Sequence, residues 1–413
     1  MRDPGFSRGC DSVKMSLPMR KSLVALLICA AAVAAALAVI ACSAGETARV
    51  ARIVVTRDAR SAGVMAAERA ARYAVNPEAL AWDIERFEKR VRAFREAVEG
   101  IWGEEEARES KPKVYVKYVD NYLSRATVDF DRGVVNVETL DPKKPLERLR
   151  SAVVTTLLTP SDPRAVDLYS AGEVRLGEIP FLYGEVKDFD GRNIRWEWRA
   201  GRFADELITR GVAVRTIKTA QGGKTAWSVS FPMVADHLQV RAAKYRGQVE
   251  ARAARYGVSR NLIFAIIKTE SDFNPFAVST APAFGLMQIV PESAGSDVHE
   301  FLHGNKGKPG RDFLFVPENN ILYGTAYLHL LENRYLSGIH DPVSREYMTI
   351  ASYNTGPGNA LRVFSRKRER AKAQVNSLSP MEVYGRLKTG LPYAETRRYL
   401  DKVLAAKKDF VIR

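Results

Sequence analysis

Cysteine is almost absent from this chain of 413 residues. Its three cysteines are Cys10, Cys29 and Cys42, so the remaining 371 positions after Cys42 contain none. This excludes a disulfide framework and a thiolate metal site from everything beyond the first 42 residues. Internal repeats are also lacking, and no linker rich in Gly, Ser or Pro divides the chain. We therefore expect its domains to pack together rather than to swing freely.

Acidic residues are fewer than basic residues in this chain. The chain has 48 Asp and Glu against 63 Lys and Arg, which gives a net charge of +15. Such a charge favours an anionic partner, which could be a nucleic acid, an anionic lipid or an anionic wall polymer, although a well-solvated basic surface explains it equally. No basic segment is interleaved with aromatic residues in a nucleic-acid motif, so we expect no nucleic-acid partner. The densest basic run, residues 362–372, indicates an exposed helix end or loop.

A long uncharged run lies near the N-terminus. Arg20 and Lys21 precede residues 23–41, which are rich in Ala, Leu and Val. The 19 residues of this run exceed the usual signal-peptide core of about 7–15 and just suffice to cross a bilayer, so an uncleaved anchor is one interpretation.

The end of the run favours a second interpretation. Residues 39–42 read Val-Ile-Ala-Cys, which resembles the lipobox of bacterial lipoproteins. This resemblance implies that residues 1–41 are a removed signal peptide, that Cys42 is acylated, and that residues 42–59 form a tether to the membrane. The residue after Cys42 is Ser43 and not Asp, which in enterobacterial lipoproteins favours the outer membrane. We therefore expect an outer-membrane lipoprotein that faces the periplasm.

The periodicity of the remaining chain predicts an α+β fold. Residues 60–108 have helical spacing. Residues 113–119 alternate as a strand, and Val128 with Phe130 and Val135 with Val137 indicate two more strands joined by a hairpin turn at 131–133. A helix is expected at 146–158, and a second hairpin near 212–233 with its turn at 221–224. We therefore predict an α+β domain with an antiparallel sheet over residues 60–233, followed by a mainly helical domain over 234–413.

One helix of the second domain ends in a carboxylate. Ser259 can cap a helix from Arg260 whose apolar face includes Ile266 and Ile267. Glu270 continues this face, where lost hydration raises a carboxyl pKa and suits a general acid. From the helix alone, a capping role beside a basic partner is the simpler interpretation. The spare carboxylates Asp272 and Glu292 are both predicted to be on the surface.

Three ordered motifs surround this helix. They are residues 270–275 (ESDFNP), 283–288 (AFGLMQ) and 352–358 (SYNTGPG). Together with Ser279, the series resembles the lytic transglycosylases of the soluble-lytic, goose-lysozyme-like family. The resemblance extends over nearly the whole chain after the lipobox, and implies that the helical domain has a lysozyme-like fold.

The resemblance also implies a reaction. Enzymes of this family cleave the β-1,4 bond between N-acetylmuramic acid and N-acetylglucosamine without water and leave a 1,6-anhydro ring. Glu270 would be the catalytic acid and base, and the substrate-binding residues carried over are Ser279, Met287, Gln288, Tyr353, Asn354 and Tyr399. Without the resemblance, Met287, Tyr353 and Tyr399 would be interpreted as core residues. Peptidoglycan glycan strands are the implied partner, and we expect a monomer that needs no cofactor and no metal.

Other interpretations remain open. Residues 299–303 read His-Glu-Phe-Leu-His, the zincin pattern of two histidines and a glutamate on a helix. Glycines on both sides of the motif, at 295 and 304, speak against the long helix that a metalloprotease needs, and position 309 is Pro. A hydrolytic lysozyme would use the same acid with water, and a wall-binding lipoprotein could retain the fold without catalysis.

Overall fold

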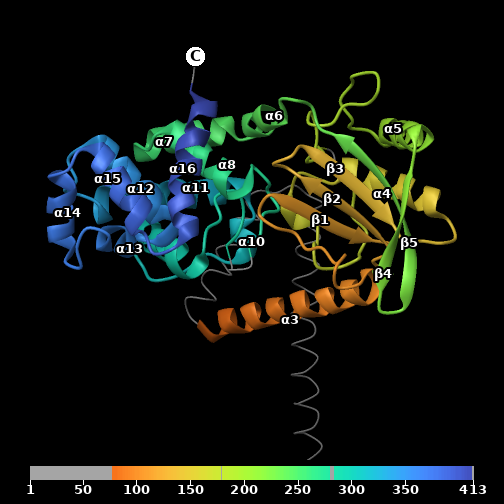
Figure 1. Cartoon of the computed structure of the whole chain (residues 1–413), viewed down its shortest axis with the longest axis horizontal. Coiled ribbons are helices and arrows are strands. Elements are labelled where there is room, and N and C mark those ends of the chain that lie inside the picture. Colours follow the sequence, from red (N-terminus) through yellow and green to blue (C-terminus); the bar gives the residue numbers. More distant parts are fainter. Residues whose placement is uncertain (1–76, 178, 280–282, 412–413) are drawn as a thin grey trace, which may run out of the picture. The chain divides into compact units, whose positions relative to one another are not determined.

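The computed structural model describes residues 77–177, 179–279 and 283–411. An antiparallel sheet with flanking helices comes first and a helical half follows, which confirms the α+β class (Figure 1). Cys42, the proposed signal peptide and the tether lie outside these residues. Among the helices that are described, none combines the length and the apolar character needed to cross a membrane.

The sheet has five strands, all antiparallel to their neighbours, in the order β1-β2-β3-β5-β4. The strands are β1 (Val114–Val119), β2 (Ser124–Asp129), β3 (Val134–Thr139), β4 (Ala213–Thr219) and β5 (Gly222–Pro232). Both predicted hairpins are confirmed, since Val128 pairs with Val135 and Thr219 pairs with Gly222. The second turn is tighter than predicted: it consists of residues 220–221, and Gly222 already belongs to β5.

Helices cover both faces of the sheet. α4 (Pro145–Leu158), which was predicted, and α5 (Glu197–Arg210), which was not, pack on the face that includes Tyr115. α3 (Pro77–Trp102) covers the opposite face, where Trp102 joins Val116 in a second cluster. The helix was expected to continue to residue 108 but ends at Trp102, because Gly103 has a φ of +84° and turns the chain away.

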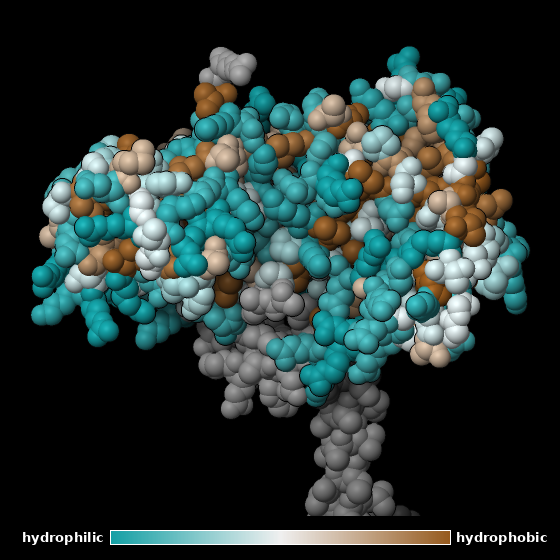
Figure 2. All heavy atoms as spheres, viewed as in Figure 1, coloured by the Kyte–Doolittle hydropathy of each residue, from teal (hydrophilic) through white to brown (hydrophobic). Residues whose placement is uncertain are grey.

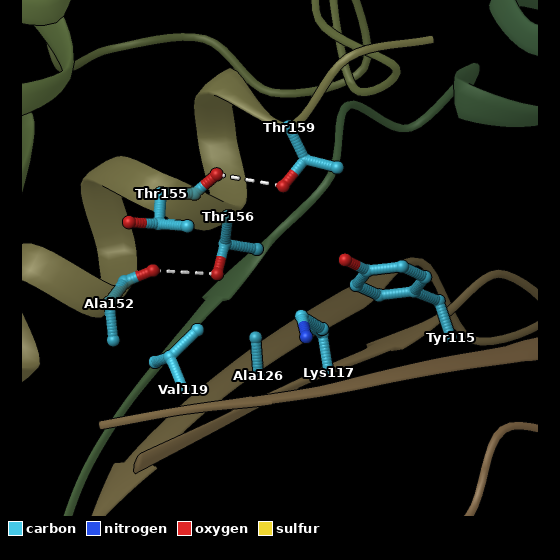
Figure 3. Close-up of a pocket in the computed structure, with 8 residues that line it drawn as sticks. All are labelled: Tyr115, Lys117, Val119, Ala126, Ala152, Thr155, Thr156 and Thr159. Atoms are coloured by element: carbon cyan, nitrogen blue, oxygen red, sulfur yellow. Dashed lines mark hydrogen bonds between the residues drawn. The ribbon is translucent and has the colours of Figure 1, made fainter. Parts of the chain in front are cut away.

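A small hollow lies between α4 and the sheet (Figure 3). Its volume of about 10 Å³ is room for roughly one water molecule. Lys117 on its floor donates to the carbonyl oxygens of Asp167 and Ser170, so its ammonium secures a loop. The hollow is far too small for a sugar ring.

The helical half begins after β5. Its helices are α6 (His237–Lys244), α7 (Arg246–Tyr256), α8 (Arg260–Ser271), α9 (Ser296–His303), α10 (Arg311–Leu314), α11 (Pro317–Leu330), α12 (Pro342–Thr355), α13 (Pro357–Arg362), α14 (Arg368–Asn376), α15 (Pro380–Gly390) and α16 (Ala394–Lys407). Short 3-10 or π turns lie at 163–165, 291–295, 331–335 and 408–410. α8 is central: every residue from Leu262 to Ile267 is buried in the hydrophobic core.

The two halves are joined by buried contacts. Phe276, which follows α8, lies in the core of the sheet half, with ring centroids 5.0 Å from Tyr115 and 5.3 Å from Phe181. Arg241 on α6 pairs with buried Glu185 at 2.7 Å. The expectation that the halves pack together agrees with these contacts. On the face seen in Figure 2, hydrophilic residues predominate and hydrophobic residues form scattered groups.

Candidate active site

Glu270 lies in the last turn of α8, as the sequence predicted. The helix begins at Arg260, and the Ser259 hydroxyl accepts a hydrogen bond from the backbone N–H of Leu262. Glu270 itself is partly exposed at the edge of the helix's buried surface. The unpaired carbonyls at a helix C-terminus carry partial negative charge, which disfavours an ionised carboxylate there.

Tyr399 on α16 holds the carboxyl group. Its hydroxyl donates to Oε1 of Glu270 at 2.7 Å. The pKa of Glu270 is raised to about 7: burial raises it most and the Glu395 carboxylate raises it as well, while the Tyr399 hydrogen bond and the charge of Lys113 lower it. Near neutral pH this carboxyl group can therefore both hold and release a proton.

Tyr353 on α12 interacts electrostatically with the same carboxyl group. Its hydroxyl donates to the backbone oxygen of Met287 at 2.8 Å. The pKa of Tyr353 is raised, mainly by burial and next by the negative charge of Glu270, so the two side chains are close enough to interact electrostatically. Tyr353, Tyr399 and Glu270 thus converge from three helices.

The turn at residues 285–288 is held against α8. Ser271, at the end of α8, donates from its hydroxyl to the Leu286 oxygen at 2.7 Å. Gly285 has a φ of +74°, and a Cβ there would lie 2.4 Å from Nδ2 of Asn320, so only glycine fits. Gln288 also has a positive φ, and its amide nitrogen donates to the Gly285 oxygen at 2.9 Å.

Asn320 supports the turn at 285–288, and the sequence did not reveal it. It is fully buried on α11, and its side-chain oxygen accepts from the Met287 N–H at 2.7 Å. Its amide nitrogen donates to the backbone oxygens of Phe284 and Leu314. One amide thereby fixes the turn that carries Met287. An Asn inside a helix was the available signal, but nothing local to it pointed to this turn.

The surface prediction for Asp272 was wrong. Its side chain is buried and pairs with Lys113 at 2.8 Å, and its backbone has a φ of +50°. The prediction assumed that helical spacing continued from Glu270, but α8 ends at Ser271 and Asp272 adopts the left-handed conformation of a helix C-cap. The surface prediction for Glu292 is confirmed, since its side chain is 41% exposed.

The remaining predicted residues differ in burial. The N–H of Ser279 donates to the Ala283 oxygen at 3.3 Å, shortly before the turn at 285–288. Met287 is fully buried, with its sulfur against Gly324, so its side chain belongs to the core. Asn354 is exposed on α12, next to Tyr353.

The zincin-like motif lies on a helix of only eight residues, α9. The rings of His299 and His303 are 4.5 Å apart, and the hydroxyl of Tyr323 lies 3.5 Å from Nδ1 of His299. Across residues 77–177, 179–279 and 283–411, no three His, Cys, Asp or Glu side chains are grouped so as to hold a metal ion.

Comparisons with known proteins agree along most of the chain. Residues 80–244 match the family model described as the N-terminal domain of membrane-bound lytic murein transglycosylase C, and residues 248–376 match the transglycosylase SLT domain. Over 334 residues the chain is 46% identical to membrane-bound lytic murein transglycosylase C of Sodalis glossinidius, covering 81% of this chain and 92% of that protein. The Klebsiella pneumoniae protein of the same name is also 46% identical, with 81% and 91% covered.

Solved structures of soluble lytic transglycosylases are similar over a shorter segment. The 70 kDa soluble lytic transglycosylase of Escherichia coli is 25% identical, with a TM-score of 0.31. The match covers 40% of this chain and 23% of that protein.

Proposed function

We propose, from the premise that this chain belongs to the membrane-bound lytic murein transglycosylase C family, that Glu270 is the acid and base of its reaction. The chain is a murein-degrading lytic transglycosylase. The observation that carries the role of Glu270 is its carboxyl group, which is held by Tyr399 at 2.7 Å and has a pKa raised by burial to about 7.

The proposed reaction has two proton transfers. Glu270 first donates its proton to the glycosidic oxygen between N-acetylmuramic acid and N-acetylglucosamine, and the C–O bond to that oxygen breaks. The N-acetyl oxygen of the muramyl sugar attacks the anomeric carbon and forms an oxazolinium ion. The C6 hydroxyl then displaces it and gives its proton to the Glu270 carboxylate, which closes the 1,6-anhydro ring. One carboxylate suffices because the substrate supplies the nucleophiles.

The surrounding residues fit this assignment. Tyr399 donates to the carboxylate in the intermediate state, when Glu270 has lost its proton. Tyr353 fixes the backbone of Met287, and Gln288 follows directly in the same turn. We assign six residues to the sugar-binding surface around Glu270: Ser279, Met287, Gln288, Tyr353, Asn354 and Tyr399. Met287 would contribute through its backbone, because its side chain is buried.

The test is release of soluble muropeptides from purified sacculi. Glu270→Gln retains the size of the side chain but cannot donate a proton, so we expect release to fall by about a hundredfold or more while the fold is kept. Glu292→Gln, which alters an exposed carboxylate, is the matched control and should release muropeptides normally. Normal release by Glu270→Gln would remove Glu270 from the mechanism.

We also propose how the enzyme is placed in the cell. Relatives are named membrane-bound. The lipobox-like sequence before Cys42 supports an acylated outer-membrane lipoprotein in the periplasm, with residues 1–41 removed and 42–59 as tether. The domains would be 60–233 and 234–413, acting as a monomer on glycan strands. Acylation and membrane fractionation of Cys42→Ala test the anchor, and an unchanged membrane fraction would refute it.

A further inference from the structure

Lys113 brings a positive charge from the sheet half to the end of α8. It lies directly before β1, and its ammonium is 2.8 Å from Oδ2 of Asp272. The two partners differ in exposure: the Lys113 side chain is 34% exposed and the Asp272 side chain 3%. A more distant carboxylate, Asp131, lies 3.9 Å from the same ammonium on the exposed side.

Further contacts fix the same turn. The amide of Asn274 donates to the backbone oxygen of Pro112 at 2.9 Å. Nε of Arg241, which is itself buried, donates to the backbone oxygen of Asp272 at 2.9 Å. Contacts from residues 112–113 and from α6 therefore both hold the turn that begins two residues after Glu270.

From this geometry, and resting on the proposed role of Glu270, we infer that Lys113 is a positioning residue for the catalytic acid. Its ion pair with Asp272 fixes the left-handed turn that ends α8. Its positive charge also favours the carboxylate form of Glu270, which must exist between the two proton transfers. The sheet half, which supplies no catalytic side chain in the proposed reaction, thereby helps to set the pH range over which Glu270 is protonated.

Several charged or titratable groups interact with Glu270. Tyr399 and Glu395 come from α16, Tyr353 comes from α12, and Lys113 precedes β1. Burial and the Glu395 carboxylate both raise the pKa of Glu270, whereas Lys113 lowers it by its charge. Removal of the Lys113 charge should consequently leave Glu270 protonated to higher pH.

The experiment measures the initial rate of muropeptide release against pH at limiting sacculus concentration. Because the first step needs protonated Glu270, activity declines as pH rises through the pKa of Glu270. We expect this alkaline decline to shift to higher pH in Lys113→Met and to stay unchanged in Lys113→Arg. Lys111→Met is the matched control: Lys111 is exposed and lies two residues away, so its profile should equal that of the wild type.

A profile of folded Lys113→Met that equals the wild type would overturn the inference, whatever happens to the maximal rate. So would an equal shift in Lys111→Met. Should thermal unfolding show that Lys113→Met does not fold, Lys113→Gln decides. Its amide can still donate a hydrogen bond to Asp272 but carries no charge, so the decline should again move to higher pH, and an unchanged profile contradicts the inference. Failure of the proposed function itself is recognised separately, by an active Glu270→Gln.

Discussion

The hydroxyl of Tyr399 lies 2.7 Å from Oε1 of Glu270, although the two residues are 129 positions apart in the sequence. The pKa of Tyr399 is raised, first by burial and then by the charge of Glu270, so its phenol keeps its proton and acts as a donor. A donor at this position stabilises the carboxylate more than the protonated acid. Tyr399 therefore counterbalances the burial that makes Glu270 a proton donor.

Tyr399→Phe removes this donor without changing the ring. We expect the pKa of Glu270 to rise, so that the alkaline decline of activity shifts to higher pH, and the rate to fall because the carboxylate intermediate loses a hydrogen bond worth about 1.5–3 kcal/mol. Tyr384→Phe is the matched control, since Tyr384 donates to a different carboxylate, Asp401. An unchanged pH profile in Tyr399→Phe, or an equal shift in Tyr384→Phe, would separate Tyr399 from the titration of Glu270.

Stability should depend on pH through Glu270. Its pKa is about 7 in the folded protein against an ordinary value of 4.5, so between these values the folded state binds more protons than the unfolded state. The contribution of Glu270 to stability is then complete below pH 4.5 and is lost as pH rises toward 7. Relative to Glu270→Gln, the wild type should lose about 2 kcal/mol of unfolding free energy over this range. This loss is smaller than the whole pKa shift would give, because water reaches part of the Glu270 side chain.

Urea unfolding at several pH values between 4 and 8 measures this difference. The free energy of unfolding of Glu270→Gln minus that of the wild type should increase with pH and level off above about 7. A difference that stays constant with pH would mean that Glu270 has an ordinary pKa.

Close packing beneath the active site gives a third prediction. A Cβ on Gly324 would lie 2.2 Å from the sulfur of Met287, so Gly324→Ala must displace the Met287 side chain, and we expect the turn at 285–288 to shift with it. We expect a loss of roughly 1–3 kcal/mol in stability and a larger loss in activity than in binding to sacculi. Gly385→Ala, on α15 with no atom within 4 Å of its added Cβ, should be neutral or stabilising. Equal stability of the two variants would show that the core accommodates the change.

Local sequence signals predicted much of the fold. Alternating residues such as Val135 and Val137 predicted the first hairpin, and Ser259 predicted the start of α8, because these signals act over a few residues. The helix at 146–158 was found to within one residue, as α4 begins at Pro145. α5 was missed, as were the end of α3 at Gly103 and the exact turn before Gly222.

The candidate site was less accessible to sequence reasoning. Glu270 could be proposed as the acid because the motifs around it resemble those of the family, whereas its helix alone favoured a capping role. Lys113 and Asn320 could not be predicted, since their contacts are made 159 and 33 residues away, with Asp272 and Met287 respectively. Asp272 was misplaced because helical spacing was applied beyond the residue where the helix ends.

The most direct test of the account is mass spectrometry of the muropeptides that the purified enzyme releases from sacculi. If Glu270 takes its second proton from the C6 hydroxyl, the muramyl ends will carry a 1,6-anhydro ring and lack one water relative to hydrolysed ends. Products with only reducing muramyl ends, or incorporation of heavy oxygen at those ends in labelled water, would show that water is the nucleophile and would contradict the account.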